Sequence, residues 1–73
     1  MLYQEYLKFV NINGLKFAYK TPFSMLELIN YMGFNKNVIV IDYNGYILDA
    51  NIWKTTFLRD NDSVEILSMA GGG

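Results

Sequence analysis

Apolar and polar residues alternate along two short stretches near the start of the chain. Residues 7–12 alternate in this way, with Val10 and Ile12 on one side of the predicted strand. Asn13-Gly14 follows and is typical of a type I′ hairpin turn, because both central residues of that turn need positive φ. The return strand, residues 15–20, is followed by a proline, which cannot donate a hydrogen bond to a strand ladder. The pattern therefore predicts a β-hairpin.

The next stretch repeats its apolar residues every three or four positions, which predicts a helix. Ser24 and Glu27 match the capping box, in which each side chain accepts a hydrogen bond from the other residue's backbone N–H. Gly33 would end the helix in a left-handed conformation, with Phe34 folded back on the last turn. The apolar stripe has the spacing of a face that packs on a core: Met25, Leu28, Ile29 and Met32.

The second half of the chain predicts three further strands. Residues 38–43 are almost continuously apolar, which favours an inner position in a sheet. Asn44-Gly45 is a second turn signal, and a short strand, residues 46–48, returns from it. The last strand, residues 63–68, again alternates between two faces.

The segment between these strands has no clear period. Three large apolar residues in it are expected to plug one end of the core: Ile52, Trp53 and Phe57. Asp60-Asn61-Asp62 reads as a turn, because Asp and Asn side chains in turns usually bond to nearby backbone. A metal site at these two aspartates would need more oxygen ligands close by, so we interpret them as turn residues.

These elements predict an α+β fold with one helix. The helix has to lie across the sheet to bury its stripe, and the last strand has to pair beside the first for the sheet to have a centre. The expected architecture is a β-grasp, a mixed sheet of four to five strands packed on one helix. We expect residues 1–68 to form this domain and residues 69–73 to be a flexible glycine-rich tail.

Composition narrows the possible functions. The 73 residues suit one domain, and a hydrophobic fraction of 52% with 18% charged residues fits a compact core plus apolar surface for a partner. A net charge of −1 without a basic run argues against nucleic-acid binding. The longest aliphatic run, residues 38–41, is too short to span a membrane, and the first residues do not resemble a signal or transit peptide. We expect a monomer that is not secreted, located in the cytoplasm or, if organelle-encoded, in an organelle stroma.

The chain contains no cysteine and no histidine. It therefore lacks a thiolate nucleophile, a cysteine-based metal site and the commonest general base. It also has no phosphate-binding loop and no Ser-His-Asp set. We expect no bound cofactor or metal, and no enzymatic activity of the chain by itself.

The sequence ends in three glycines preceded by Ala70. Because they have no Cβ atoms, Gly71, Gly72 and Gly73 would pass through a channel too narrow for side chains. Such a tail would carry the α-carboxylate of Gly73 to the far end of that channel. A frayed terminus or a cloning remnant would look the same, so the tail alone does not decide between these interpretations.

Body and tail together resemble the ubiquitin-like sulfur carriers, most closely the ThiS family of thiamine biosynthesis. The resemblance runs from about Lys8 to Gly73 and lies in the order of the elements. The matching segments are residues 10–14 with the first Asn-Gly turn, the capped helix start at 24–29, residues 44–48 with the second Asn-Gly turn, Trp53, and residues 58–66. Asn61 stands where the family's Asp-Gly-Asp turn has glycine, and asparagine tolerates the left-handed angles needed there. Residues 1–7 extend beyond the usual start of the family.

The resemblance implies a carrier on which partner proteins perform the chemistry. An adenylating enzyme, similar to ubiquitin-activating enzymes, would use ATP and a metal to adenylate the Gly73 carboxylate. A persulfide on another protein would then supply the sulfur of a C-terminal thiocarboxylate, which a thiazole synthase would consume. Leu67 and Met69 are candidate docking residues next to the tail, with ordinary edge packing as the alternative.

Two other interpretations stay open. The first keeps the chemistry and changes the pathway: the small subunit of molybdopterin synthase, or a carrier for tRNA thiolation. Molybdopterin carriers tend to be longer and often have prolines just before the Gly-Gly, whereas Pro22 is the only proline here. The second is a ubiquitin-like interaction module, or a modifier joined to lysines, without sulfur transfer.

Overall fold

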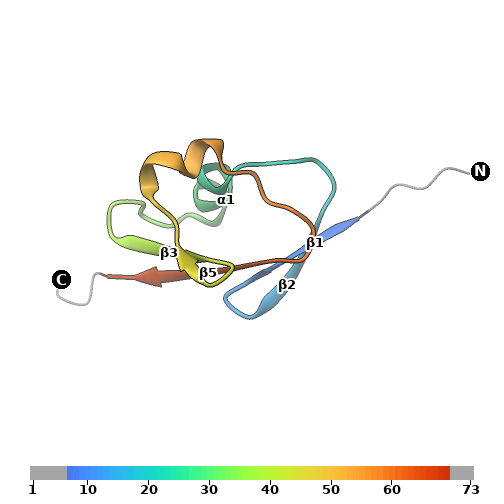
Figure 1. Ribbon diagram of the computed structural model, residues 1–73, viewed down its shortest axis with the longest axis horizontal. Helices are drawn as coiled ribbons and strands as arrows, with labels where there is room; N and C mark the ends of the chain where they lie inside the picture. The colour runs from blue at the N-terminus through green and yellow to red at the C-terminus, as the bar shows by residue number, and fades with distance from the viewer. Residues whose placement is uncertain (1–6, 70–73) are drawn as a thin grey trace, which may run out of the picture.

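The computed structural model describes residues 7–69, which form a five-stranded mixed sheet, one α-helix and one 3₁₀ helix. The elements in chain order are β1 (Lys8–Ile12), β2 (Leu15–Tyr19), α1 (Met25–Met32), β3 (Ile39–Tyr43), β4 (Tyr46–Ile47), η1 (Ala50–Thr55) and β5 (Asp62–Ser68). The strand order across the sheet is β2-β1-β5-β3-β4. Figure 1 shows α1 and the 3₁₀ helix η1 on the same side of this sheet.

The last strand lies at the centre of the sheet, as predicted. β5 pairs with β1 in parallel, with Val10 opposite Asp62 and Ile12 opposite Val64. On its other side β5 pairs with β3 in antiparallel orientation, from Tyr43 opposite Val64 to Ile39 opposite Ser68. The predicted α+β, β-grasp architecture with a mixed sheet and one helix is therefore confirmed.

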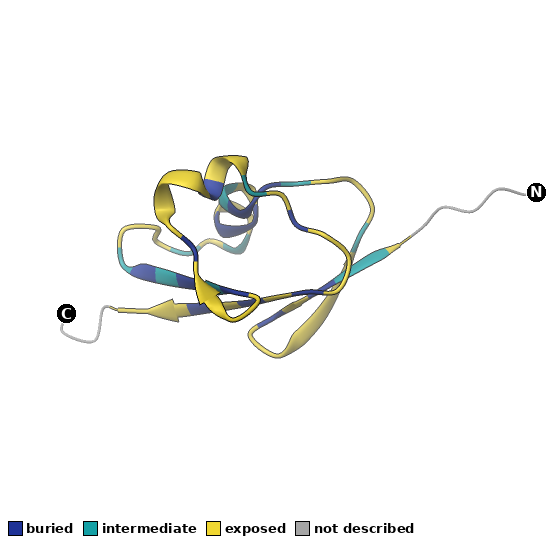
Figure 2. Cartoon of the chain, viewed as in Figure 1, coloured by how far each residue is buried: buried dark blue, intermediate teal, exposed yellow. Residues whose placement is uncertain are grey.

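The helix begins and ends where its capping residues predict. The Ser24 backbone N–H donates to Glu27 Oε1 at 2.8 Å, and the Glu27 N–H donates to Ser24 Oγ at 3.1 Å. Gly33 takes a φ of 81°, and the Phe34 N–H then donates to the Ile29 carbonyl at 3.2 Å. The apolar stripe of α1 faces the sheet, as Figure 2 shows by its buried positions.

The core is made by the inward-facing residues of three adjacent strands and the helix stripe. Its fully buried members include Val10, Met25, Ile29, Ile41 and Val64. Burial of each such side chain stabilises the fold by about 1.5–3 kcal/mol relative to its exposure to water. Alternation along β1 and β5 thus decides which face of the sheet receives the helix.

Burial in residues 49–57 differs from what the sequence pattern predicted. Asp49 caps η1 by accepting the Asn51 N–H at 2.9 Å. Trp53 is buried as expected, and its indole N–H donates to the Leu48 carbonyl at 3.2 Å. Ile52 and Phe57, however, are 46% and 51% exposed, so their predicted place in the core is wrong.

The geometry of the 3₁₀ helix explains this error. Successive side chains in such a helix are about 120° apart, so Ile52 and Trp53 cannot both face the core. Phe57 follows η1 in extended backbone and forms an isolated bridge with Ser24. Leu48 and Leu58, on either side of this segment, are buried in the core instead.

Candidate functional site

The C-terminal end of β5 is the part of the described structure that leads to the predicted reactive terminus. The Met69 backbone N–H donates to the Val38 carbonyl at 2.6 Å, which continues the β3–β5 ladder one residue past the strand. The residues predicted to react or to enter a partner's channel lie outside the described residues: Ala70, Gly71, Gly72 and Gly73. Their predicted roles stay predictions.

Both predicted docking residues lie on the sheet face opposite the helix. Val64 and Ile66 of β5 point into the core, so Leu67 and Met69 point away from it. Leu67 is 49% exposed and Met69 is 62% exposed. These residues are accessible to a partner, and their role in docking stays a prediction.

Two apolar residues of neighbouring strands extend this surface. Val40 lies opposite Leu67 in the β3–β5 ladder and is half-buried. Ile47 of β4 lies opposite Asp42, on the same face as Val40, and is exposed. We call the four residues Val40, Ile47, Leu67 and Met69 the terminal patch. These four residues place apolar surface on the outer face of the sheet beside the end of β5.

Two carboxylates border the terminal patch. Asp42 and Glu65 are directly opposite each other on the same outer face of the sheet. Asp42 also accepts the Gly45 N–H at 3.0 Å, which holds the β3–β4 turn. The outer face near the terminus therefore combines apolar contact area with negative charge, and a partner with basic groups around an apolar surface would complement it.

The asparagines of the two Asn-Gly turns fix the register of β5. Asn13 and Asn44 both have φ values of 51°, as their turns require. The Asn13 side-chain oxygen accepts the Ile66 N–H at 2.6 Å, and the Asn44 side-chain oxygen accepts the Ser63 N–H at 2.8 Å. Each turn thus also bonds to the central strand, so the path of β5 to its end is held from both sides.

A buried carboxylate at the start of β5 was not anticipated from the sequence. Asp62 is only 7% exposed and accepts the Tyr43 hydroxyl at 2.5 Å, the Arg59 N–H at 2.7 Å and the Asn44 amide N–H at 3.1 Å. Burial and then the hydrogen bond to Asp62 raise the pKa of the Tyr43 phenol above its ordinary value. The contact with Arg59 confirms the predicted turn, and the other two contacts tie this turn to β3.

Asp60 and Asn61 of this turn have structural roles as well. Asp60 accepts the Phe9 N–H at 2.8 Å, and Asn61 adopts a φ of 71° in the position where the turn needs left-handed backbone. Within residues 7–69, no group of three or more acidic, histidine or cysteine side chains is placed to hold a metal ion. Over the same residues, no helix is both long and apolar enough to cross a membrane.

Comparisons with known proteins match both the folded domain and the C-terminal residues of this chain. The family model of the ThiS family matches residues 4–73. The uncharacterized protein ycf40 of Porphyra purpurea is 38% identical over 64 residues, which cover 88% of this chain and 90% of that protein. The uncharacterized protein ycf40 of Trieres chinensis is 32% identical over 62 residues, which cover 85% of each chain.

A solved structure confirms the architecture independently. The crystal structure of the thiamine biosynthesis protein ThiS from Geobacter metallireducens superposes with a TM-score of 0.76 at 24% identity, over 89% of this chain and 99% of that one. This likeness shows the shared β-grasp fold. The sequence match to the family model also includes the C-terminal glycines. The resemblance found in the sequence is therefore confirmed, and the chain belongs to the ThiS family.

Proposed function

We propose that this chain is a sulfur carrier of thiamine biosynthesis and that its reactive group is the carboxylate of Gly73. The observation that carries the proposal is that the ThiS family match includes the three C-terminal glycines, and that β5, the strand before them in the chain, is held in register to its end. A rigid body that ends beside an exposed apolar patch suits the delivery of a short tail into a partner's active site.

The chemistry explains why the tail consists of glycines. A carboxylate is a poor electrophile until one of its oxygens becomes part of a good leaving group. An adenylating enzyme would transfer AMP from ATP to the Gly73 carboxylate and release pyrophosphate. A protein persulfide would then displace AMP and form an acyl disulfide, and a thiol would cleave its S–S bond, leaving the thiocarboxylate and a new disulfide. Because glycine has no side chain, it leaves the carboxylate open to the phosphate of ATP and the carbonyl carbon open to the persulfide.

In this scheme the chain supplies the group to be modified and a surface by which partners hold it. The adenylating partner would use the ATP and the metal. The sulfur would come from a partner as well, because the chain has no cysteine to supply it. The adenylating enzyme and the thiazole synthase must both receive the same tail, so both would contact the terminal patch and would exclude each other. The proposed carrier acts as a monomer in the cytoplasm or in an organelle stroma.

Mass spectrometry of the intact chain tests the chemical part of the proposal. The chain is incubated with an adenylating enzyme that acts on ThiS carriers, ATP and a persulfide donor. The expected product has one sulfur in place of one oxygen. Deletion of Gly73, or addition of one residue after it, should abolish this change while the far-ultraviolet circular dichroism stays that of the parent. Normal loading of the extended variant would contradict the proposal.

The same measurement separates the other interpretations. An isopeptide adduct on a lysine of another protein would indicate a modifier, and an unchanged mass would indicate an interaction module without sulfur transfer. If the thiocarboxylate forms, addition of a thiazole synthase or of a molybdopterin synthase large subunit identifies the pathway by which of the two consumes the sulfur.

A matched pair of variants on the outer face of the sheet tests whether partners dock on the terminal patch. Leu67→Asp places a charge in the terminal patch, and Asn11→Asp places the same charge on the outer face of β1 at an exposed position away from the patch. Leu67→Asp should lower kcat/KM for loading about tenfold or more, as loss of an apolar anchor does at an interface. Asn11→Asp should stay within about twofold of the parent. Equal effects of the two changes would show that the patch does not dock.

A further inference from the structure

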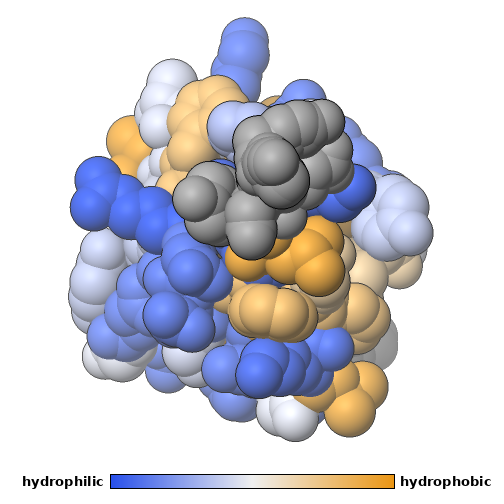
Figure 3. Space-filling view, turned by 90° about the vertical axis from the view of Figure 1, so that its right-hand side faces the viewer, coloured by the Kyte–Doolittle hydropathy of each residue, from blue (hydrophilic) through white to orange (hydrophobic). Residues whose placement is uncertain are grey.

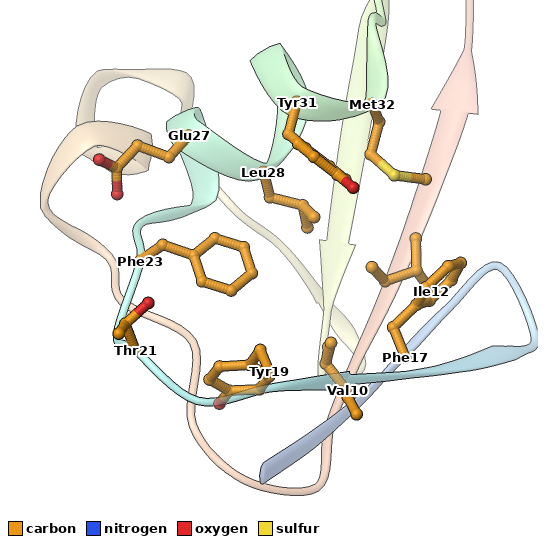
Figure 4. Close-up of a pocket in the computed structure, with 11 residues that line it drawn as sticks. Val10, Ile12, Phe17, Tyr19, Thr21, Phe23, Glu27, Leu28, Tyr31 and Met32 are labelled. Carbon is orange, nitrogen blue, oxygen red and sulfur yellow. The ribbon is translucent and has the colours of Figure 1, made fainter. Parts of the chain in front are cut away.

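Among the strands of residues 7–69, β2 lies at an open edge of the sheet, and this edge borders a groove. β2 pairs with β1 on one side and lies at the end of the strand order on the other. Between this edge and α1 lies a groove of about 440 Å³, a size within the range of ligand and peptide pockets. In Figure 4 the labelled side chains of β1 and β2 lie on one side of this space, and Leu28, Tyr31 and Met32 reach into it from the helix.

The groove is lined mainly by apolar and aromatic side chains. Phe17 and Tyr19 alternate along β2 and face the groove, and the Tyr19 ring packs edge-on against Phe23 at 5.2 Å between ring centres. Tyr31 of α1 is 85% exposed at its rim. Figure 3 views the molecule from the side on which β1 begins, and apolar side chains also gather in the middle of that face. Apolar surface is therefore not confined to the terminal patch.

The backbone at this edge is arranged to accept another strand. Ile12 and Leu15 flank the two-residue turn and exchange hydrogen bonds with each other. Along the hairpin from this pair, every second pair of facing residues exchanges hydrogen bonds. Val10–Phe17 is the next such pair. The N–H and C=O groups of Lys16 and Ala18 consequently face the open edge. An extended peptide that bonds to them would place every second side chain over the groove, which is the mode called β-augmentation.

The charged side chains around the β2 edge indicate which charge a bound peptide must carry. Residues 7–26 contain three of the six basic residues of the chain, Lys8, Lys16 and Lys20, and no Asp or Glu. Asp60, from outside this segment, is bound to the Phe9 N–H at the start of β1. Lys16 lies 4.7 Å from the centre of the Phe9 ring on the outer face. The one acidic side chain at the groove, Glu27, is bound to the Ser24 N–H in the helix cap. A second copy of this hairpin would bring like charges together, whereas an acidic partner would be attracted.

We propose that the β2 edge and its groove bind an extended segment of a partner protein in which apolar residues alternate and acidic residues flank them. This site lies on the helix side of the sheet, whereas the terminal patch lies on the opposite face. A partner held at β2 thus leaves the terminal patch and the chain end accessible. The site does not depend on sulfur transfer and stands if the proposed function fails.

A peptide titration followed by nuclear magnetic resonance of the ¹⁵N-labelled chain tests this inference. The probe is a synthetic peptide in which valine or isoleucine alternates with threonine between pairs of aspartates, and the control peptide has lysines in place of the aspartates. The expected result is saturable shifts of the Lys16, Phe17 and Ala18 backbone amides with the acidic peptide, and binding at least about fivefold weaker with the basic one. Absence of these shifts at millimolar peptide, or equal binding of both peptides, would overturn the proposal.

Two substitutions at one position separate backbone pairing from side-chain effects. Ala18→Pro removes an N–H that faces the open edge, where proline is tolerated, and Ala18→Ser keeps it. Ala18→Pro should weaken binding of the acidic peptide about fivefold or more, and Ala18→Ser should stay within about twofold. If Ala18→Pro does not fold, Lys16→Glu provides the test, because it should weaken the acidic peptide and strengthen the basic one. Equal affinity of parent and Lys16→Glu would refute the inference, as would a dimer paired through β2 in sedimentation equilibrium of the free chain.

Discussion

Substitution of Asp62 by alanine is the sharpest test of how this fold is held together. The carboxylate of Asp62 is buried and accepts three hydrogen bonds, which join the start of β5 to β3 and to the β3–β4 turn. Asp62→Ala removes both acceptor oxygens and with them all three hydrogen bonds. The Tyr43 hydroxyl then loses its partner, although the Tyr43 side chain is only 7% exposed.

The cost follows from where each donor lies. The buried bond from Tyr43 to a charged acceptor contributes about 1.5–3 kcal/mol. The N–H donors of Arg59 and Asn44 belong to exposed residues that water reaches, so each contributes about 0.5–1 kcal/mol. The sum is about 2.5–5 kcal/mol. A chain of this length has a total stability of roughly 4–11 kcal/mol, so the loss is a large share of it.

Urea unfolding monitored by circular dichroism measures this loss. With a slope of about 1 kcal/mol per molar urea, typical of the smallest domains, the midpoint of Asp62→Ala should fall by about 2.5–5 M. The control is Asp60→Ala, two residues away, which loses one exposed hydrogen bond from the Phe9 N–H and should cost about 0.5–1 kcal/mol. If the two variants unfold at the same urea concentration, the buried network does not stabilise the fold as argued.

Three further predictions concern the core and the tyrosines. Met25→Asp puts an unpaired carboxylate at a position with 0% exposure, so it should abolish the cooperative thermal transition, and a melt like that of the parent would show that this helix face is not core. The pKa of Tyr43 is raised above 10.0 in the folded chain, so its stabilising contribution is complete below pH 10.0 and is lost above it by about 1.4 kcal/mol per pH unit until the folded pKa is reached. Urea titrations at alkaline pH should therefore show a shallower decline for Tyr43→Phe than for the parent, and parallel declines would contradict this assignment. The Tyr19 hydroxyl is buried without a hydrogen-bond partner among the described residues, so Tyr19→Phe should raise the free energy of unfolding by about 1 kcal/mol, and a destabilised variant would reveal a partner for that hydroxyl.

The elements of this protein were predictable because their signals are local. The capping box joins residues three positions apart, and each Asn-Gly turn needs only its own two φ angles. The alternation of β1 and β5 and the stripe of α1 then identify which residues face the core. One helix and strands with this order allow few arrangements, so the β-grasp fold and the ThiS resemblance followed from the sequence.

The tertiary structure decided those features that join residues far apart in the chain. The oxygen of Asn13 accepts the N–H of a residue 53 positions later, and Asp62 accepts a hydroxyl 19 positions before it. No local pattern distinguishes such a carboxylate from an ordinary turn residue. The exposed positions of Ile52 and Phe57, the shared face of the terminal patch and the open edge of β2 likewise depend on which element lies beside which. Propensity acts over a few neighbouring residues, whereas burial and charge pairing depend on the whole packed molecule.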